Sequence, residues 1–151
     1  MYVGVRRYIL TGTILKLYEQ DVTDMRSEQR FNNFKKALAW YEAALSTNMS
    51  RLEEEGLIQR FEYTFELAWK TLQDLLDERG YANVRGPRPV IEQAFQDGVI
   101  GEGALWLEML KTRNETVHLY DEGTFKRICH SVKGPYVECL KAFGNAFPHK
   151  K

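Results

Sequence analysis

The segment 57–79 constrains the fold of this chain most, because its apolar residues repeat with the period of an α-helix. One face of that helix carries Phe61, Phe65, Ala68, Leu72, Leu75 and Leu76. Upstream, Ser50 followed by Glu53 has the form of a capping box, and Gly80 suits the position just after a helix end. The segment therefore predicts a long helix with one buried face.

Further helices are expected on both sides of this segment. The apolar spacing predicts helices over 28–46, from Pro87 or Pro89 to Phe95, over 104–117, and over 125–147 with a kink at Gly134-Pro135. In the 104–117 helix, the residues expected to point inward are Leu105, Trp106, Met109, Leu110 and Val117. Alternation typical of strands is absent from the sequence. We predict an all-α fold, an up-and-down bundle of four long helices and one short one.

Residues 1–24 differ from the rest, because they are rich in β-branched residues and show no clean period. We expect an N-terminal extension that is loosely attached, or a mis-assigned start with Met25 as the true first residue. Residues 25–151 would then form the bundle. The length of 151 residues suits one such domain.

Composition excludes some classes of function. Lys and Arg number 21 and Asp and Glu also number 21, so the formal net charge is zero. This balance argues against a protein that binds nucleic acid or membranes by bulk attraction, although it permits a local basic pocket. Because no apolar run reaches the roughly 18 residues of a membrane span, we expect no membrane association.

The sequence offers few groups for a metal or a cofactor. Cys129 and Cys139 are ten residues apart, a spacing that fits neither a zinc knuckle nor a thioredoxin-type pair. They indicate reduced thiols in a cytoplasmic protein. The glycines of 98–103 lack the pattern of a phosphate-binding loop. We therefore expect no metal and no cofactor.

Glu62 and Glu66 are carboxylates one helical turn apart. Such a pair could bind a metal or act in acid–base chemistry. The alternative is a solvated polar stripe neutralised by Lys70, and we favour it because ion-pair stripes are common on helices.

The segment 113–120, RNETVHLY, holds the strongest candidates for chemistry. The guanidinium of Arg113 can hold a phosphate, the imidazole of His118 can move a proton near neutral pH, and the phenol of Tyr120 can donate or be modified. Asn114 stands beside them as a supporting group. The structural alternative is a helix C-terminus at which Arg113 and His118 cap carbonyls.

On one regular helix Arg113 and His118 would point about 140° apart, so they could not reach a single atom. Either the helix ends before His118, or the site is assembled from two chains related by a twofold axis.

These residues carry a resemblance to a known family. Arg113, His118 and Tyr120 match the motif of HEPN-domain proteins of the toxin type, which are encoded beside a minimal nucleotidyltransferase. Three blocks in order resemble the nucleotidyltransferase substrate-binding protein family, a branch of the same group. They are QRFEYTFELAWKTL (59–72), PVIEQAF (89–95) and WLEML (106–110). The resemblance runs from about residue 25 to residue 147.

The resemblance implies a HEPN-like bundle of four to five helices that forms a homodimer and works with a minimal nucleotidyltransferase encoded nearby. In toxin-type members it implies metal-independent endoribonuclease activity, with RNA as the substrate. Carried over, Arg113 and His118 would be catalytic, Asn114 would support them, and Tyr120 would accept AMP from the partner in a toxin–antitoxin pair. The family name implies the alternative, a non-catalytic substrate-binding subunit of a two-component nucleotidyltransferase.

Overall fold

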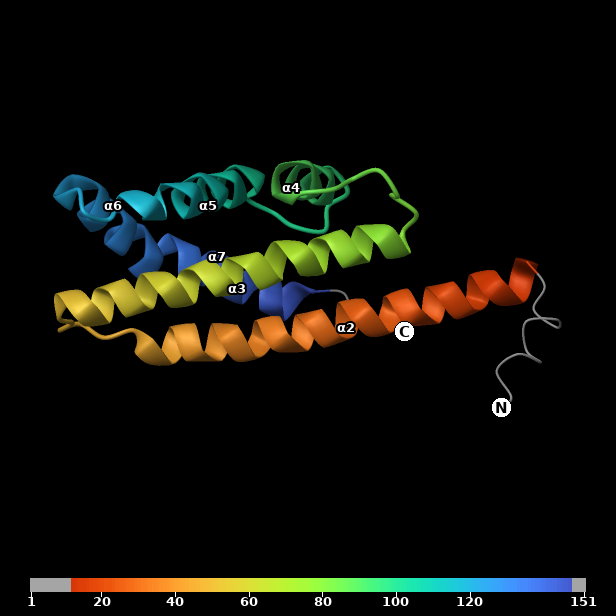
Figure 1. The fold of residues 1–151 in the computed structure, drawn as a ribbon, viewed down its shortest axis with the longest axis horizontal. Coiled ribbons are helices and arrows are strands. Elements are labelled where there is room, and N and C mark those ends of the chain that lie inside the picture. The colour runs from red at the N-terminus through yellow and green to blue at the C-terminus, as the bar shows by residue number, and fades with distance from the viewer. Residues whose placement is uncertain (1–11, 148–151) are drawn as a thin grey trace.

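The computed structural model describes residues 12–147, with side chains from residue 26 onward, and is all-α over that range (Figure 1). Its elements are α2 (Gly12–Ala44), α3 (Arg51–Glu78), α4 (Pro87–Gln96), α5 (Gly103–Glu115), the 3₁₀ turn η1 (Thr116–His118), α6 (Glu122–Lys133) and α7 (Pro135–Ala146). No strand occurs among these residues, so the predicted fold class is confirmed.

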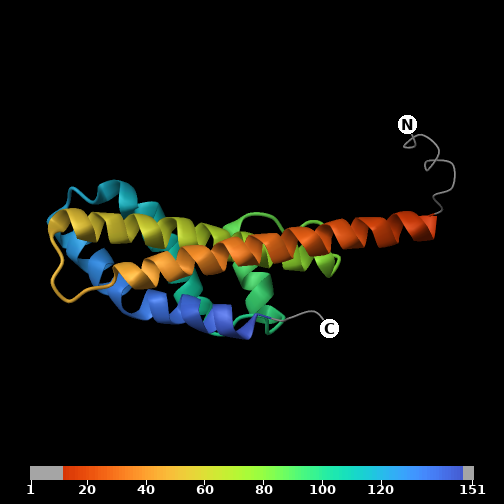
Figure 2. The same cartoon turned by 90° about the horizontal axis from the view of Figure 1, so that it is seen from below.

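The long helices α2 and α3 run antiparallel, side by side, and form the spine of the bundle (Figures 1 and 2). Helices α4 and α5 follow on one side of α3, and α6 and α7 return the chain toward α2. Ser50 starts α3 with the predicted capping box. Its Oγ accepts from the Glu53 amide at 3.1 Å, and its own amide donates to the Glu53 carboxylate at 2.9 Å. Gly80 follows the end of α3 with a φ of 91°, as the sequence predicts.

Helix α2 begins earlier than the sequence predicts, at Gly12 and not near residue 28. The backbone reason is plain, because 13–28 contains neither proline nor glycine and nothing in it stops a helix. The first turns of α2 project beyond the other helices in both views. Residues 1–11 of the predicted extension lie outside the described residues. The division of the chain near residue 24 stays a prediction.

A single core of aromatic and aliphatic side chains joins the helices, and the predicted face of α3 is buried throughout. Phe143 of α7 links the elements most directly, since its ring lies 5.2 Å from the Phe34 ring and 5.3 Å from the Trp106 ring. Both contacts have the edge-to-face geometry that aromatic pairs prefer. The core therefore ties α2, α5 and α7 together.

The predicted kink at Gly134 and Pro135 is a full break between α6 and α7. Pro135 cannot continue the ladder of a preceding helix, because its ring removes a donor and clashes with the turn before it. Val132, one of the last four residues of α6, has a carbonyl that accepts a 2.5 Å hydrogen bond from the buried Tyr41 hydroxyl of α2. Tyr41 therefore caps the break from outside the helix.

Cys129 and Cys139 are free and buried. Burial raises the pKa of the Cys129 thiol to about 11 and that of the Cys139 thiol to about 12. Both thiols are therefore protonated at neutral pH, which makes them packing groups and poor nucleophiles. Among the helices described, none is long and apolar enough to cross a membrane.

Candidate functional site

Helix α5 carries the first half of the motif and is fixed from its buried side. Trp106, Met109 and Leu110 lie in the core. At the next turn, Thr112 Oγ1 and Tyr136 Oη of α7 share a buried hydrogen bond of 2.6 Å. These contacts hold the outer face of α5, on which Arg113 and Asn114 stand exposed.

The helix ends at Glu115, and Thr116–His118 winds as a 3₁₀ turn. The prediction of an inward-facing Val117 is wrong, because 72% of this side chain is exposed. Val117 lies beyond the last residue of α5, on a 3₁₀ turn of which no residue is buried, so it does not extend the apolar stripe of α5. The regular helix ends before His118, which is the first of the two alternatives for the motif, and a site assembled from two chains stays a prediction.

His118 and Tyr120 meet on the exposed turn that follows. His118 Nδ1 lies 3.0 Å from Tyr120 Oη, and the two rings are edge-to-face with centroids 5.7 Å apart. Tyr120 is 81% exposed. The phenol and the imidazole therefore form one polar unit that a ligand can reach.

Arg113 does not join that unit. Its Nη2 atom lies 3.0 Å from Glu66 Oε2 of α3, whereas the side chain of His118 contacts Tyr120. The end of the helix therefore does not, within one chain, bring Arg113 and His118 onto a common contact. Asn114 stands beside Arg113 on the last turn of α5, exposed.

The favoured interpretation of Glu62 and Glu66 fits the structure. Lys70 Nζ lies 3.3 Å from Glu66 Oε1, which neutralises the stripe as expected. The sequence did not reveal that the same stripe faces α5. There Glu66 pairs with Arg113, and Glu62 accepts a hydrogen bond from Thr116 Oγ1 at 2.8 Å. The only signal available was the spacing of one helical turn that separates Glu62 from Glu66 and Glu66 from Lys70.

Within the motif, Glu115 also has a basic neighbour. Arg127 Nη2 of α6 lies 3.1 Å from Glu115 Oε2. The negative charge of Glu115 is thereby paired away from the His118 and Tyr120 unit.

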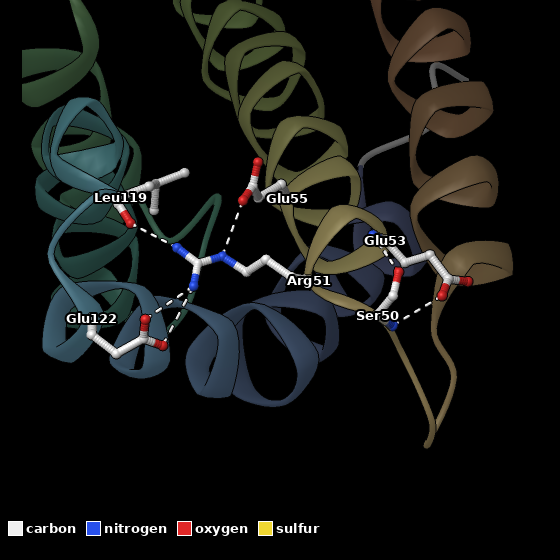
Figure 3. Close-up of polar contacts among 6 residues, drawn as sticks. All are labelled: Ser50, Arg51, Glu53, Glu55, Leu119 and Glu122. Carbon is white, nitrogen blue, oxygen red and sulfur yellow. Dashed lines mark hydrogen bonds and ion pairs between the residues drawn. The ribbon is translucent and has the colours of Figure 1, made fainter.

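A functional contact that the sequence analysis missed comes from Arg51, the first residue of α3 (Figure 3). Its Nη2 donates to the carbonyl oxygen of Leu119, the residue between His118 and Tyr120, at 3.1 Å. Its Nη1 lies 3.0 Å from Glu122 Oε2 at the start of α6. Helical periodicity does not predict such contacts, because Leu119 and Glu122 are far from Arg51 in the sequence.

Asp121 closes the motif turn by capping α6. Its carboxylate accepts hydrogen bonds from the Thr124 amide at 2.9 Å and from the Thr124 hydroxyl at 2.8 Å. These hydrogen bonds, and to a smaller degree the nearby His118, lower the pKa of Asp121 below its usual range. The carboxylate is therefore ionised at neutral pH and anchors the chain after Tyr120.

Metal ligands do not gather in the part of the chain that the structure describes: no three His, Cys, Asp or Glu side chains lie close enough together to hold an ion. What the site offers is a surface with a paired guanidinium, an imidazole and a phenol.

The structure is a helical bundle with an exposed Arg, His and Tyr motif at the end of one helix. Comparison with known families assigns this combination to a class of protein. Residues 29–147 match the family described as nucleotidyltransferase substrate binding protein like. This chain belongs to that family, and the resemblance predicted from the sequence is confirmed.

Two individual proteins are similar to this chain. A protein of Thermus thermophilus with a known crystal structure is 34% identical, with a TM-score of 0.68 over 73% of this chain and 94% of that one. The probable ribonuclease HepT of Haemophilus influenzae is 30% identical over 71 residues, 44% of this chain and 49% of the relative. The match to that ribonuclease thus spans about half of the relative's length and shows a distant homology.

Proposed function

We propose that this protein is the HEPN-type component of a toxin–antitoxin pair and that, as a homodimer, it cleaves RNA without a metal ion through Arg113 and His118. The observation that carries the proposal is the exposed, hydrogen-bonded His118 and Tyr120 unit on the turn after Arg113 and Asn114. The distant homology to a probable ribonuclease supports the same reaction.

The chemistry follows from the residue types. RNA carries its own nucleophile, the 2′-hydroxyl, next to each phosphate. His118 takes the proton of that hydroxyl, the freed oxygen bonds to phosphorus, and the 5′-oxygen leaves and takes up a proton. Arg113 binds the phosphate oxygens and stabilises the charge that builds on them, and Asn114 supports this contact.

A homodimer completes the site in this proposal. Arg113 and His118 have different partners within one chain, so a twofold axis near η1 would let Arg113 of one protomer and His118 of the other address one phosphate. The exposed Val117 beside them is an apolar side chain that such an interface would cover.

Cleavage of a labelled RNA in excess EDTA tests the activity. We expect the wild-type dimer to cleave, and Arg113→Ala and His118→Ala to lose at least about a hundredfold in rate while keeping their melting temperature. Arg88→Ala and His130→Ala are matched controls, because both side chains are exposed and lie outside the motif. RNA that stays intact with freshly purified, unmodified wild-type protein contradicts the proposal.

Tyr120 is the proposed target of the nucleotidyltransferase partner. Its exposed phenol oxygen would bond to the α-phosphorus of ATP as the bond to pyrophosphate breaks, and His118 Nδ1 at 3.0 Å is placed to take the phenol proton. Incubation with the partner and ATP should add the mass of one AMP group to the wild type. Tyr120→Phe should gain none, whereas Tyr63→Phe should gain one. Label on Tyr120→Phe would place the modification elsewhere.

A second candidate function is a non-catalytic subunit that supplies substrate to the nucleotidyltransferase. It is favoured by one observation, the pairing of Arg113 with Glu66, which occupies the guanidinium that RNA cleavage needs. In that case the protein would co-purify with the partner and change its rate of nucleotide transfer, and His118→Ala would do the same. The RNA assay above separates the two functions.

A further inference from the structure

Each nitrogen atom of the Arg51 guanidinium forms a polar contact around the motif turn (Figure 3). Nε pairs with Glu55 at 3.0 Å, Nη1 with Glu122 at 3.0 Å, and Nη2 with the Leu119 carbonyl at 3.1 Å. The guanidinium carbon also lies 3.5 Å from the centroid of the buried Phe125 ring. Only a planar guanidinium with several donors can make these contacts at once, so lysine is no substitute.

The dipole of α3 does not favour a basic residue at this place. The first turn of a helix favours acidic side chains, because the N-terminal end of its dipole is positive. Glu53 and Glu54 follow that rule and Arg51 opposes it. The capping box at Ser50 fixes the backbone on which Arg51 stands, so its side chain reaches out from a rigid base.

The Leu119 carbonyl is the point at which Arg51 touches the motif. This carbonyl belongs to the peptide bond that joins Leu119 to Tyr120, and His118 lies on the other side of Leu119. Both flanking side chains are exposed, so core packing does not orient them. The hydrogen bond from Arg51 is one of the contacts on this turn, together with the packing of Leu119 against the core and the bond from the Asp121 amide to the His118 carbonyl, and on this turn the imidazole and the phenol lie 3.0 Å apart.

We infer that Arg51 is a positioning residue that acts through the Leu119 carbonyl to hold His118 against Tyr120. The part of this inference that concerns catalysis rests on the proposed ribonuclease function. Arg51 itself touches no reacting atom. Its loss should lower kcat and leave KM for RNA nearly unchanged, whereas loss of a phosphate-binding residue would raise KM.

The test compares Arg51→Gln and Arg51→Lys with the matched control Arg88→Gln. Arg88 is a suitable control because it also pairs with a glutamate four residues on, Glu92 at 3.3 Å, on the exposed face of α4 and outside the motif. The first measurement is by NMR and needs no activity. It follows the cross-peaks between the His118 and Tyr120 rings and the exchange rate of the Asp121 amide, which donates to the His118 carbonyl at 3.0 Å.

In both Arg51 variants we expect the ring cross-peaks to weaken and amide exchange to rise about tenfold or more, with wild-type values in Arg88→Gln. We further expect kcat to fall by about tenfold to a hundredfold, because small displacements of a catalytic group cost rates of that order. Unchanged cross-peaks and exchange in Arg51→Gln overturn the inference, as does full rescue by lysine. A wild type that cleaves no RNA overturns the proposed function alone, since the NMR result stands by itself.

Discussion

At the scale of single residues, the guanidinium of Arg113 is paired with the carboxylate of Glu66. The two groups lie 3.0 Å apart and are partly exposed, with 42% of the Arg113 side chain and 27% of the Glu66 side chain accessible. Ion pairs of this kind contribute little net free energy, because water and salt screen them. The phosphodiester of RNA, whose single negative charge is shared by two oxygens, can therefore displace the carboxylate at small cost.

Glu66→Gln should increase the affinity for a short RNA by about twofold to fivefold, since it removes a competitor worth the free energy of one exposed pair. Fluorescence anisotropy with a non-cleavable oligonucleotide measures the change. Glu92→Gln is the control, because Glu92 also pairs with an arginine, at 3.3 Å, but outside the motif. Weaker binding by Glu66→Gln would mean that Glu66 orients Arg113 for the phosphate.

The same residues mark what a sequence can foretell at this scale. Chemistry alone offers the motif residues as candidates beside the alternative of a capped helix end, and spacing within one helix predicts the Glu66–Lys70 pair. The contacts of Glu66 with Arg113 and of Arg51 with Leu119 cannot be predicted in this way, because they depend on the lateral packing of α3 against α5 and α6. The prediction for Val117 fails because one turn of 3₁₀ geometry replaces the expected α-helix.

At the scale of elements, the cap of α6 is sensitive to acid. The pKa of Asp121 is lowered in the folded state, mainly by the hydrogen bonds from Thr124. A carboxylate with a depressed folded pKa adds stability that is complete above its unfolded pKa of about 4 and is lost as the pH falls through the lower folded value.

Asp121→Ala should therefore melt at a lower temperature than the wild type at pH 7, and the difference should shrink as the pH falls below about 4. Asp121→Asn is the matched control, because asparagine also caps helices but does not titrate. Thermal melts from about pH 2 to pH 7 measure both. A difference that stays constant over that whole range would show that the charge of Asp121 has no part in the cap.

The hydroxyl of Tyr41 caps the break between α6 and α7. Burial raises the pKa of this hydroxyl, with a smaller contribution from Tyr136, so the hydroxyl stays protonated and donates to the Val132 carbonyl. Tyr41→Phe removes that donor and leaves a buried carbonyl unpaired, which should cost about 1–3 kcal/mol of unfolding free energy.

Urea denaturation measures this cost. Tyr81→Phe serves as the control, because Tyr81 is only half-buried and water can replace the hydrogen bonds of its hydroxyl with Gln93, at 3.3 Å, and with Asp97. Equal stability of Tyr41→Phe and the wild type would mean that another donor or water replaces the hydroxyl.

Element boundaries are predictable wherever a strong local signal exists. The capping box at Ser50, the glycine at 80 and the Gly134-Pro135 pair all mark real ends. The start of α2 has no such signal, because its first turns carry only a weak apolar pattern. The helix continues there because its residues tolerate helical backbone, although the apolar periodicity on which the prediction relies is weak.

At the scale of the whole molecule, the family match runs from residue 29 to residue 147, and the buried apolar core of the residues with described side chains runs from Phe31 to Phe147. A chain that begins at Met25 should therefore keep the bundle and melt within a few degrees of the full-length protein. Circular dichroism of the two chains checks this, with a start at Leu38 as the control, since it removes the buried Phe31 and Phe34 and should prevent folding. Loss of the bundle on starting at Met25 would make the N-terminal segment part of the fold.

The zero net charge of the whole chain is matched by a local pairing of charges at the motif. Arg113, Arg51 and Arg127 each stand within about 3 Å of a carboxylate of the same molecule. Arginines that pair with RNA phosphates make binding depend on salt, because cations condensed on the RNA are released as each phosphate is neutralised. Here the group that leaves Arg113 is Glu66, a counterion tethered to α3. This carboxylate does not enter solution when it leaves Arg113, so the salt dependence of binding there should reflect only the cations that the RNA phosphate releases.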